Sequence, residues 1–375
     1  MQAPHLFVDI SAHGFGHLAQ AAPVINMLAA RVPMLRLTIR SGLPRAKLDE
    51  RLNCAFSHLE ARSDFGYVML DAMRVDLPAT ALAYRRQHAD WARTVDEEAS
   101  FLVALQPTLV LSDVAYLPLA GAARAGIPSV ALCSLNWAEL FAHFFAAADW
   151  APQIHQQMLA AYNGAEFFLR LTPGMPMADL RRRRCIGPVA ALGVDRRQAL
   201  RQQLDCPADE RLVLIAFGGI DTRLPVADWP PLAGIRWLVP QAWRLRQANT
   251  TDFEPLGLPM IDLLRSVDAV IAKPGYGTFA EAACNATPLL YVRRQEWPEQ
   301  DCLIEWLHAH ACCAGISDAD LRAGHLQAAL AALWQRPQRQ PPRPTGADEA
   351  VTALLPWLVP GGTRPGVRSS PSSPP

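Results

Sequence analysis

The stretch "HLFVDISAHGFGH" (5–17) contains the strongest signal for the fold of the first half of the chain. Residues 5–10 are mostly apolar and follow a proline, which predicts a short buried strand. A turn with two glycines, Gly14 and Gly16, comes next, and residues 18–31 then place apolar side chains at helical spacing. A strand that leads through a glycine turn into a helix is the opening unit of an α/β domain.

The glycine turn at 11–17 matches neither of two common phosphate-binding motifs. Gly14 and Gly16 are followed by Ala19, where the dinucleotide fingerprint G-x-G-x-x-G requires a third glycine. No Gly-Lys-Ser or Gly-Lys-Thr follows, so the turn is not a P-loop. His17 falls at the start of the helix, where it either points into a cleft as a functional group or only caps and packs. The spacing leaves both interpretations open.

Short apolar runs and longer helical patterns keep alternating along the chain. Strands that alternate with helices predict parallel, doubly wound sheets. Further strands are predicted at 35–40, 108–113, 128–134, 235–240 and 288–294. Two more strands, each followed by a loop, are predicted within 211–220 and 269–277. Helices are predicted at 81–105, around "GAARAG" (121–126), and at 260–267, 278–286, 299–311 and 347–358.

The pattern predicts two α/β domains. The first domain is expected over 1–170 and the second over 190–335. Segment 171–189 is rich in proline, glycine and arginine and is interpreted as a linker, with its four arginines solvated rather than forming a binding patch. A Pro-rich connection and a C-terminal helix are expected over 336–359, followed by a disordered tail over 360–375.

Composition places the chain among globular proteins. It has 375 residues, of which 51% are hydrophobic, so it is long and apolar enough for a large core. Because 35 basic residues balance 35 acidic ones, nothing global predicts binding to nucleic acid. None of the eight cysteines lies in a C-x-x-C pair or at zinc spacing from histidines, which predicts reduced thiols and no metal site. Because no signal peptide is recognised either, a cytoplasmic protein is expected. The apolar stretches are interrupted well before the ~18 residues that a membrane span needs.

Two further loops follow predicted strands, at the edge where parallel sheets hold their ligands. Asp113 ends the strand 108–113, where its carboxylate either orients a histidine or caps the next segment. In "KPGYGTFAEA" (273–282), Gly275 and Gly277 open a helix whose free N–H groups can bind phosphate.

The same loop offers side chains as well as backbone groups. The Thr278 hydroxyl lies beside the helix start, and Glu281, one turn on, is placed either to accept hydrogen bonds from ribose or to form a capping box with Thr278. A second glycine turn, "FGGI" (217–220), belongs to the same predicted domain. Two glycine turns after two strands of one domain favour phosphate binding more than either does alone.

Together these stretches resemble the GT-B glycosyltransferases. More narrowly, they are similar to the glycosyltransferase-like N-terminal region of plant L-arabinokinases and to stand-alone bacterial relatives. The similarity runs through most of residues 5–310, and nothing resembles the phosphate loop of the kinase domain, so sugar kinase activity is not implied. The stretches that carry it are "HGFGH" (13–17), "VDLPAT" (75–80), "LVLSDV" (109–114), "AGIPSV" (125–130), "KPGYGTFAEA" (273–282) and "YVRR" (291–294).

The resemblance implies two Rossmann-like domains that face a cleft, acceptor-binding first and nucleotide-sugar-binding second. It implies that His17 is the general base and that Asp113 orients it. The residues that it or the motifs point to as substrate contacts are His13, Gly14, Gly16, Asn136, Trp137, Gly218, Gly219, Lys273, Gly275, Tyr276, Gly277, Thr278, Glu281, Glu299 and Gln300.

The expected function is an inverting transfer of sugar from a nucleotide-diphospho-sugar, such as a UDP-sugar, to an unknown small-molecule or lipid-linked acceptor. No metal and no cofactor beyond the donor substrate are expected. Two alternatives are a nucleotide-sugar epimerase on the same fold and a non-catalytic nucleotide-sugar-binding module. The aromatic segment "NWAELFAHFFAAADW" (136–150) is interpreted as a core helix or as a surface for peripheral membrane contact.

Overall fold

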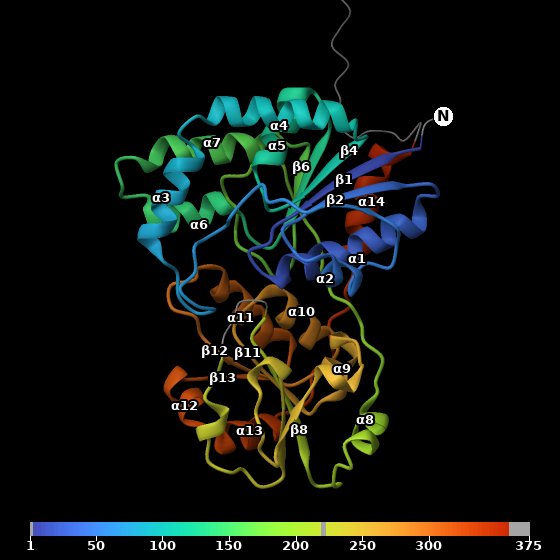
Figure 1. The fold of residues 1–375 in the computed structure, drawn as a ribbon, viewed down its shortest axis with the longest axis vertical. Helices are drawn as coiled ribbons and strands as arrows, with labels where there is room; N and C mark the ends of the chain where they lie inside the picture. Colours follow the sequence, from blue (N-terminus) through green and yellow to red (C-terminus); the bar gives the residue numbers. More distant parts are fainter. Residues whose placement is uncertain (1–2, 219–222, 360–375) are drawn as a thin grey trace, which may run out of the picture.

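Each half of the chain folds around one parallel β-sheet (Figure 1). The computed structural model describes residues 3–218 and 223–359, so Gly219 and the tail predicted at 360–375 lie outside the described residues. The sequence-predicted α/β architecture of two doubly wound domains is confirmed.

The N-terminal sheet has seven strands in the order β3-β2-β1-β4-β5-β6-β7, and every neighbouring pair is parallel. The chain starts in the middle of this sheet and winds outward in both directions. Such a sheet has its topological switch point between β1 and β4, where ligands bind at the carboxyl ends of the strands. The strands are β1 (His5–Ile10), β2 (Arg36–Arg40), β3 (Ser57–Leu59), β4 (Leu109–Asp113), β5 (Ser129–Cys133), β6 (Phe167–Arg170) and β7 (Arg183–Cys185).

The C-terminal sheet repeats this arrangement: its described residues, outside 219–222, form six parallel strands in the order β10-β9-β8-β11-β12-β13. Its switch point therefore lies between β8 and β11. The strands are β8 (Arg211–Ala216), β9 (Ile235–Val239), β10 (Thr250–Asp252), β11 (Ala269–Ala272), β12 (Leu289–Val292) and β13 (Cys313–Ile316).

Helices cover the faces of both sheets (Figure 1). They are α1 (Phe15–Arg31), α2 (Arg45–Asp49), α3 (Leu77–Gln87), α4 (Trp91–Leu105), α5 (Leu117–Ala125), α6 (Trp137–Phe145), α7 (Ala151–Gly164), α8 (Arg197–Gln203), α9 (Met260–Ser266), α10 (Tyr276–Cys284), α11 (Glu299–His310), α12 (Asp318–Ala323), α13 (Gln327–Trp334) and α14 (Gly346–Leu358), with three short 3-10 helices at Val226–Asp228, Gln241–Trp243 and Glu254–Leu256.

Two sequence predictions about element boundaries are wrong. The single helix predicted at 81–105 is two helices, because the Asp90 side chain accepts a hydrogen bond from Arg93 N and thereby caps a new helix, α4. The predicted linker 171–189 contains β7, which pairs with β6 at the edge of the N-terminal sheet. All three residues of β7 are exposed, so this strand has no buried face. Its sequence therefore lacks the alternation of apolar and polar residues that would predict a strand.

The C-terminal helix α14 returns to the N-terminal domain, beside α1 (Figure 1). Arg31 at the end of α1 forms an ion pair with Asp348, and Gly346 N donates a hydrogen bond to Pro188 O. Buried apolar side chains of α1, α10 and α14 belong to one continuous cluster that reaches both sheets. The two domains are therefore joined by a shared core as well as by the chain crossing near residue 190.

Helix α6 occupies most of the aromatic segment 136–150 and belongs largely to the core. Trp137, Leu140 and Phe141 are fully buried and Phe145 is nearly so, which supports the core interpretation of this segment. Among residues 3–218 and 223–359, none of the helices combines the length and the apolar character that crossing a membrane requires.

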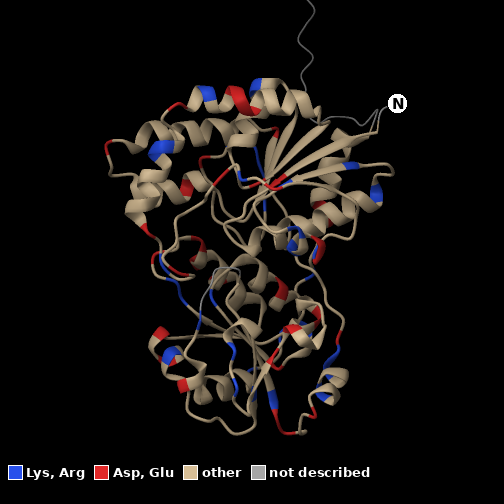
Figure 2. Cartoon of the chain, in the orientation of Figure 1, with Lys and Arg blue, Asp and Glu red and all other residues tan. Residues whose placement is uncertain are grey.

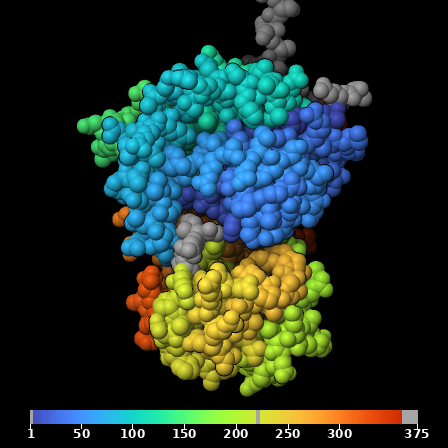
Figure 3. All heavy atoms as spheres, viewed as in Figure 1, coloured from blue at the N-terminus to red at the C-terminus, as the bar shows by residue number. Residues whose placement is uncertain are grey.

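The surface shows how the domains meet. In the space-filling view the N-terminal domain lies above the C-terminal domain, and their boundary crosses the molecule (Figure 3). Acidic and basic residues are interspersed over both domains (Figure 2), as the balance of 35 basic and 35 acidic residues leads one to expect.

Candidate functional site

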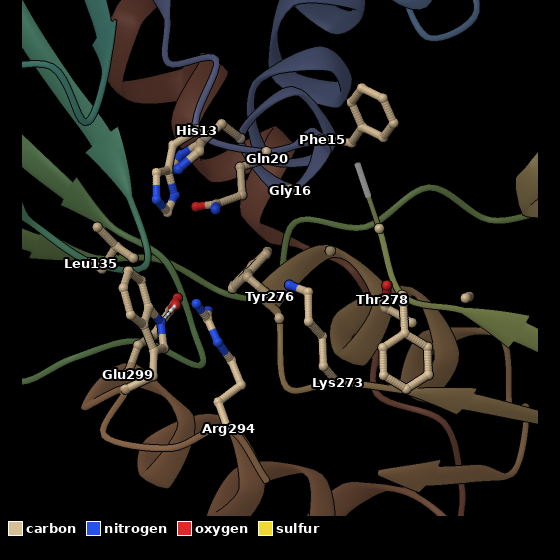
Figure 4. A pocket seen from close by; sticks show the side chains of 18 residues that line it. His13, Phe15, Gly16, Gln20, Leu135, Lys273, Tyr276, Thr278, Arg294 and Glu299 are labelled. Atoms are coloured by element: carbon tan, nitrogen blue, oxygen red, sulfur yellow. Dashed lines mark hydrogen bonds between the residues drawn. The ribbon is translucent and has the colours of Figure 1, made fainter. Parts of the chain in front are cut away.

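A cavity lies between the two domains and receives the N-termini of two helices, α1 from above and α10 from below (Figure 4). About 700 Å³ of space, part of it open to solvent, is free of protein atoms here. Both helices directly follow strands at the switch points, β1 and β11, so the two halves of the cavity arise from the same strand–turn–helix unit. The lining residues are His13, Gly14, Phe15, Gly16, His17, Gln20, Leu135, Ala216, Phe217, Gly218, Lys273, Gly275, Tyr276, Gly277, Thr278, Arg294, Trp297 and Glu299.

His17 lines the cavity from the first turn of α1 and is held from behind by Asp113. Its Nδ1 lies 3.3 Å from Asp113 Oδ1, although the two residues are 96 positions apart. Asp113 ends β4, the strand next to β1, so the parallel pairing brings the carboxylate under the start of α1. The His17 side chain is 7% exposed and that of Asp113 only 1%, so this pair is buried at the cavity wall.

The surroundings of His17 set its protonation. Burial lowers its pKa, but the charge and hydrogen bond of Asp113, with smaller contributions from Asp64 and Glu299, outweigh burial, so the pKa of His17 is raised above its usual value of 6.5. His13, by contrast, is buried without a carboxylate partner, and burial together with the nearby His17, Arg294 and Lys273 puts its pKa well below 6.5. The two histidines of the turn thus have opposite electrostatic environments, and only His17 is suited to take up a proton near neutral pH.

A third group, Cys133, approaches the same imidazole. Its Sγ lies 3.9 Å from His17 Nδ1, and the ligand atoms of His17, Asp113 and Cys133 are all within 4.8 Å of one another. A histidine, a carboxylate and a thiol at this spacing can also hold a metal ion. Burial raises the pKa of Cys133 well above its usual range, which disfavours the thiolate that a metal needs.

The start of α10 forms the opposite wall. Gly275 is its N-cap, and no side chain caps this end, so the first backbone N–H groups of the helix have no intrahelical partner. The helix does not begin at Thr278, which rules out the capping box of Thr278 with Glu281. Gly277 is required by packing, since a Cβ there would lie 2.9 Å from Ala19 Cβ of α1.

Two cationic side chains enter the cavity from the C-terminal domain, Lys273 and Arg294 (Figure 4). Burial, together with the charge of Arg294, lowers the pKa of Lys273 to about 7, and burial lowers the pKa of Arg294 to about 10. Lys273 makes neither a hydrogen bond nor an ion pair with the described residues. The helix N-terminus, Lys273 and Arg294 together make this side of the cavity attractive to anions.

The loop after β12 carries Trp297 to the N-terminal domain, and Glu299, the first residue of α11, follows it there. The Trp297 indole stacks on His13 at 5.8 Å between ring centroids and lies in the same apolar cluster as Tyr67 and Trp137. Glu299 accepts a hydrogen bond from Ser134 Oγ at 2.6 Å and another from Trp297 Nε1 at 3.1 Å. This loop therefore joins the two walls of the cavity.

Eleven of the predicted site residues line the cavity. They are His13, Gly14, Gly16, His17, Gly218, Lys273, Gly275, Tyr276, Gly277, Thr278 and Glu299. The Tyr276 phenol itself points away from the cavity, because its oxygen accepts a hydrogen bond from Val189 N.

Four other predicted residues are engaged elsewhere. Asp113 acts on the cavity only through His17. Asn136 caps α6 by accepting a hydrogen bond from Glu139 N, and Trp137 Nε1 donates to Asp64 at 2.7 Å. Glu281 forms an ion pair with Arg51 of the N-terminal domain instead of facing the cavity.

Gln300 also lies outside the cavity lining, and its contacts explain why. Its Oε1 accepts a hydrogen bond from Arg294 N at 2.8 Å and its Nε2 donates to Arg294 O at 2.9 Å. Gln300 thus fixes the backbone of Arg294, a cavity residue that sequence reasoning missed as a site residue. The motif "YVRR" contains Arg294, and the sequence does not reveal that Arg294 is buried whereas its neighbour Arg293 is exposed and paired with Asp301.

Sequence comparison finds one informative relative. An L-arabinokinase of Arabidopsis thaliana is 26% identical over 332 residues, which cover 84% of this chain but only 30% of that protein. No protein-family model matches the chain. This chain thus spans less than a third of the length of the relative that it matches.

Solved glycosyltransferases share the whole fold. The glycotransferase of kitacinnamycin is 16% identical, with a TM-score of 0.60 over 96% of this chain and 95% of that one. UGT71G1 of Medicago truncatula, solved with UDP-glucose, is 12% identical, with a TM-score of 0.56 over 96% of each chain. The chain has the two-domain α/β fold of the GT-B glycosyltransferases, and the similarity to these enzymes and to L-arabinokinase that the motifs predict is confirmed.

Proposed function

We propose that this protein is a glycosyltransferase that moves a sugar from a nucleotide-diphospho-sugar to an acceptor hydroxyl, with inversion at the anomeric carbon. One observation carries the proposal: His17, paired with Asp113, and the uncapped N-terminus of α10 line one cavity from opposite domains. The GT-B fold and the presence of UDP-glucose in a structural neighbour support it.

The donor diphosphate binds at the start of α10 in this proposal. The free N–H groups after Gly275 and the positive end of the helix dipole neutralise its charge, and Lys273 adds an ammonium group. The same groups stabilise the nucleoside diphosphate as it leaves, because negative charge grows on it as the bond to the sugar breaks.

His17 is the general base of the proposed reaction. Its Nδ1–H donates to Asp113, which leaves Nε2 free to accept the proton of the acceptor hydroxyl. The acceptor oxygen attacks the anomeric carbon from the face opposite the diphosphate, a new C–O bond forms and the bond to the diphosphate breaks. Asp113 stabilises the imidazolium that results, as its effect on the His17 pKa indicates.

The test separates binding from turnover. Nucleoside diphosphates and nucleotide-sugars are screened by thermal shift, since a ligand of the native state raises the unfolding temperature. His17→Ala is expected to bind the best ligand normally but to lose transfer by about 10²–10⁴-fold, measured as nucleoside diphosphate released in the presence of acceptor candidates. The proposal is wrong if the wild type binds no nucleoside diphosphate, or if His17→Ala turns over as fast as the wild type.

A further inference from the structure

Buried polar atoms without hydrogen-bond partners gather around one side chain, Trp297. Within the described residues, His13 Nε2, Tyr67 Oη and Arg294 Nε and Nη2 are buried and unpaired. Trp297 is next to all three residues: its ring centroid lies 5.8 Å from that of His13, 5.7 Å from that of Tyr67 and 4.0 Å from Arg294 Cζ. Unpaired buried polar groups are rare and costly in native proteins, so four at one place call for a ligand.

The unpaired atoms of Arg294 specify the kind of ligand. Nε and Nη2 form one edge of the guanidinium plane, the edge that binds both oxygens of a carboxylate in parallel. Arg294 is 7% exposed, and no described carboxylate forms an ion pair with it. The two acidic residues whose charges act on its pKa have other partners: Glu299 accepts from Ser134 and Trp297, and Asp71 from the Arg74 side chain.

The diphosphate does not account for this edge. The proposed diphosphate site is the N-terminus of α10 with Lys273. In Figure 4 the Lys273 ammonium lies between Thr278 and Arg294, whereas the Arg294 guanidinium lies beside Glu299, on the side away from Thr278. The sugar must lie between the diphosphate and His17, which places its ring near Arg294, His13 and Trp297. Tyr67 and His13 each offer a polar atom suited to a sugar hydroxyl.

We propose that the space covered by Trp297 is a subsite for a sugar carboxylate, with Arg294 as its anchor, so that one sugar substrate is a uronic acid. His13 and Tyr67 bind hydroxyl groups of the same sugar, and the Trp297 ring moves aside to admit it. The inference rests on the proposed function. The uronic acid is either the donor sugar or the acceptor, and the experiment distinguishes the two.

Two binding arms use matched sugars that differ only in a carboxylate. The first compares nucleotide-linked glucose and galactose with the corresponding glucuronate and galacturonate, on the base selected by the nucleoside diphosphate screen. The second compares the free methyl glycosides of the same four sugars in the presence of saturating nucleoside diphosphate. In one arm the wild type is expected to bind a uronate at least ~10-fold more tightly than its neutral partner, because a bidentate charged hydrogen bond is involved.

Variants assign this preference to Arg294. Arg294→Gln is expected to abolish it at pH 6, where Lys273 is mostly protonated with or without the charge of Arg294, and to weaken nucleoside diphosphate binding much less than uronate binding. Arg294→Lys should keep only part of the preference, since the charge remains without the two donors of the Nε–Nη2 edge. Arg293→Gln is the matched control, because Arg293 is exposed and paired with Asp301, and it should keep the full preference. Circular dichroism and the unfolding temperature check that each variant is folded.

The outcomes separate this inference from the proposed function. If nucleoside diphosphate binds but neither arm shows a preference for the uronate, the subsite is refuted while the proposed function stands. If Arg294→Gln weakens nucleoside diphosphate binding as much as uronate binding, Arg294 serves the diphosphate and the inference is wrong. If no nucleoside diphosphate binds, the proposed function fails, and the inference fails with it.

Discussion

At the scale of single residues, the character of His17 comes from what lies behind it. The sequence places a histidine at the start of a helix and an aspartate at the end of a strand, but it does not show that the two meet. Parallel pairing of β1 with β4 brings them to 3.3 Å. Position relative to a strand end was therefore a good predictor, because the edge of a parallel sheet gathers residues from distant parts of the chain.

Position alone does not show that Glu281 pairs with Arg51. Its partner Arg51 is 230 residues away in the other domain, and nothing near Glu281 in the sequence reveals that pairing. Arg294 was missed for the related reason that burial distinguishes it from its exposed neighbour Arg293. Local motifs predict which loops reach the cavity, whereas the choice of side chain within a loop depends on packing between domains.

Asp113→Asn is expected to shift the pH profile of transfer to lower pH and to reduce its plateau. A general base works when unprotonated, so the raised pKa of His17 places the acidic limb of kcat/KM above the ordinary histidine value of about 6.5. Asparagine removes the carboxylate charge, the pKa of His17 falls, and a weaker base remains at high pH. Cys133→Ala is the control: it removes a neutral neighbour of the same nitrogen and should leave the limb in place. An unchanged limb in Asp113→Asn would refute the role of Asp113.

Lys273 makes nucleotide binding depend on pH. Because its pKa is about 7 in the free protein, it is increasingly neutral above that pH, and only the protonated form attracts the diphosphate. Affinity for nucleoside diphosphate should therefore fall as pH rises from 7 to about 9. Binding near pH 8 should take up protons, which calorimetry detects by comparing buffers of different ionisation enthalpy. Lys273→Met should abolish the uptake; equal uptake in that variant would assign the proton to another group.

At the scale of elements, strands were easier to predict than connections. The completely buried runs of β1, β4 and β5 are short and apolar, with the bounds that the sequence indicates to within one or two residues. The break between α3 and α4 and the exposed strand β7 were missed. In the first case a single capping aspartate interrupts a continuous helical pattern, and in the second an arginine-rich edge strand has no buried face.

The contact of α1 with α10 tests whether the cavity depends on close helix packing. Gly277→Ala is expected to destabilise the protein by about 1–3 kcal/mol, because the new Cβ would lie 2.9 Å from Ala19 Cβ. Ala19→Gly alone costs about 0.5–1 kcal/mol, as glycine does inside a helix. The double variant removes the clash and should be more stable than Gly277→Ala, as measured by denaturant unfolding. Strictly additive effects would show that the two helices do not press on each other at this point.

At the scale of the whole molecule, the two domains are held together by contacts that are far apart in the sequence. Three of these contacts are the apolar cluster through α1, α10 and α14, the loop that carries Trp297 into the aromatic core of the N-terminal domain, and the ion pair of Arg51 with Glu281. Only the first could be anticipated from sequence, as apolar helix faces. The other two depend on how the domains are placed relative to each other, which sequence periodicity and motifs do not predict.

Removing one or the other partner of the Arg51–Glu281 ion pair is expected to reduce stability by unequal amounts. The Glu281 side chain is 5% exposed, whereas that of Arg51 is 26% exposed and can reach water by itself. Arg51→Gln leaves a buried carboxylate without its counter-charge and is expected to cost about 1–3 kcal/mol of stability, whereas Glu281→Gln should cost less. The double variant Arg51→Gln/Glu281→Gln should recover part of the loss, because no buried charge is left unpaired. These stabilities are compared by thermal and denaturant unfolding at pH 7. Should Glu281→Gln prove the more harmful variant, and chiefly by weakening nucleoside diphosphate binding, Glu281 would instead serve the ribose, and the ion pair with Arg51 would have to open for the donor to bind.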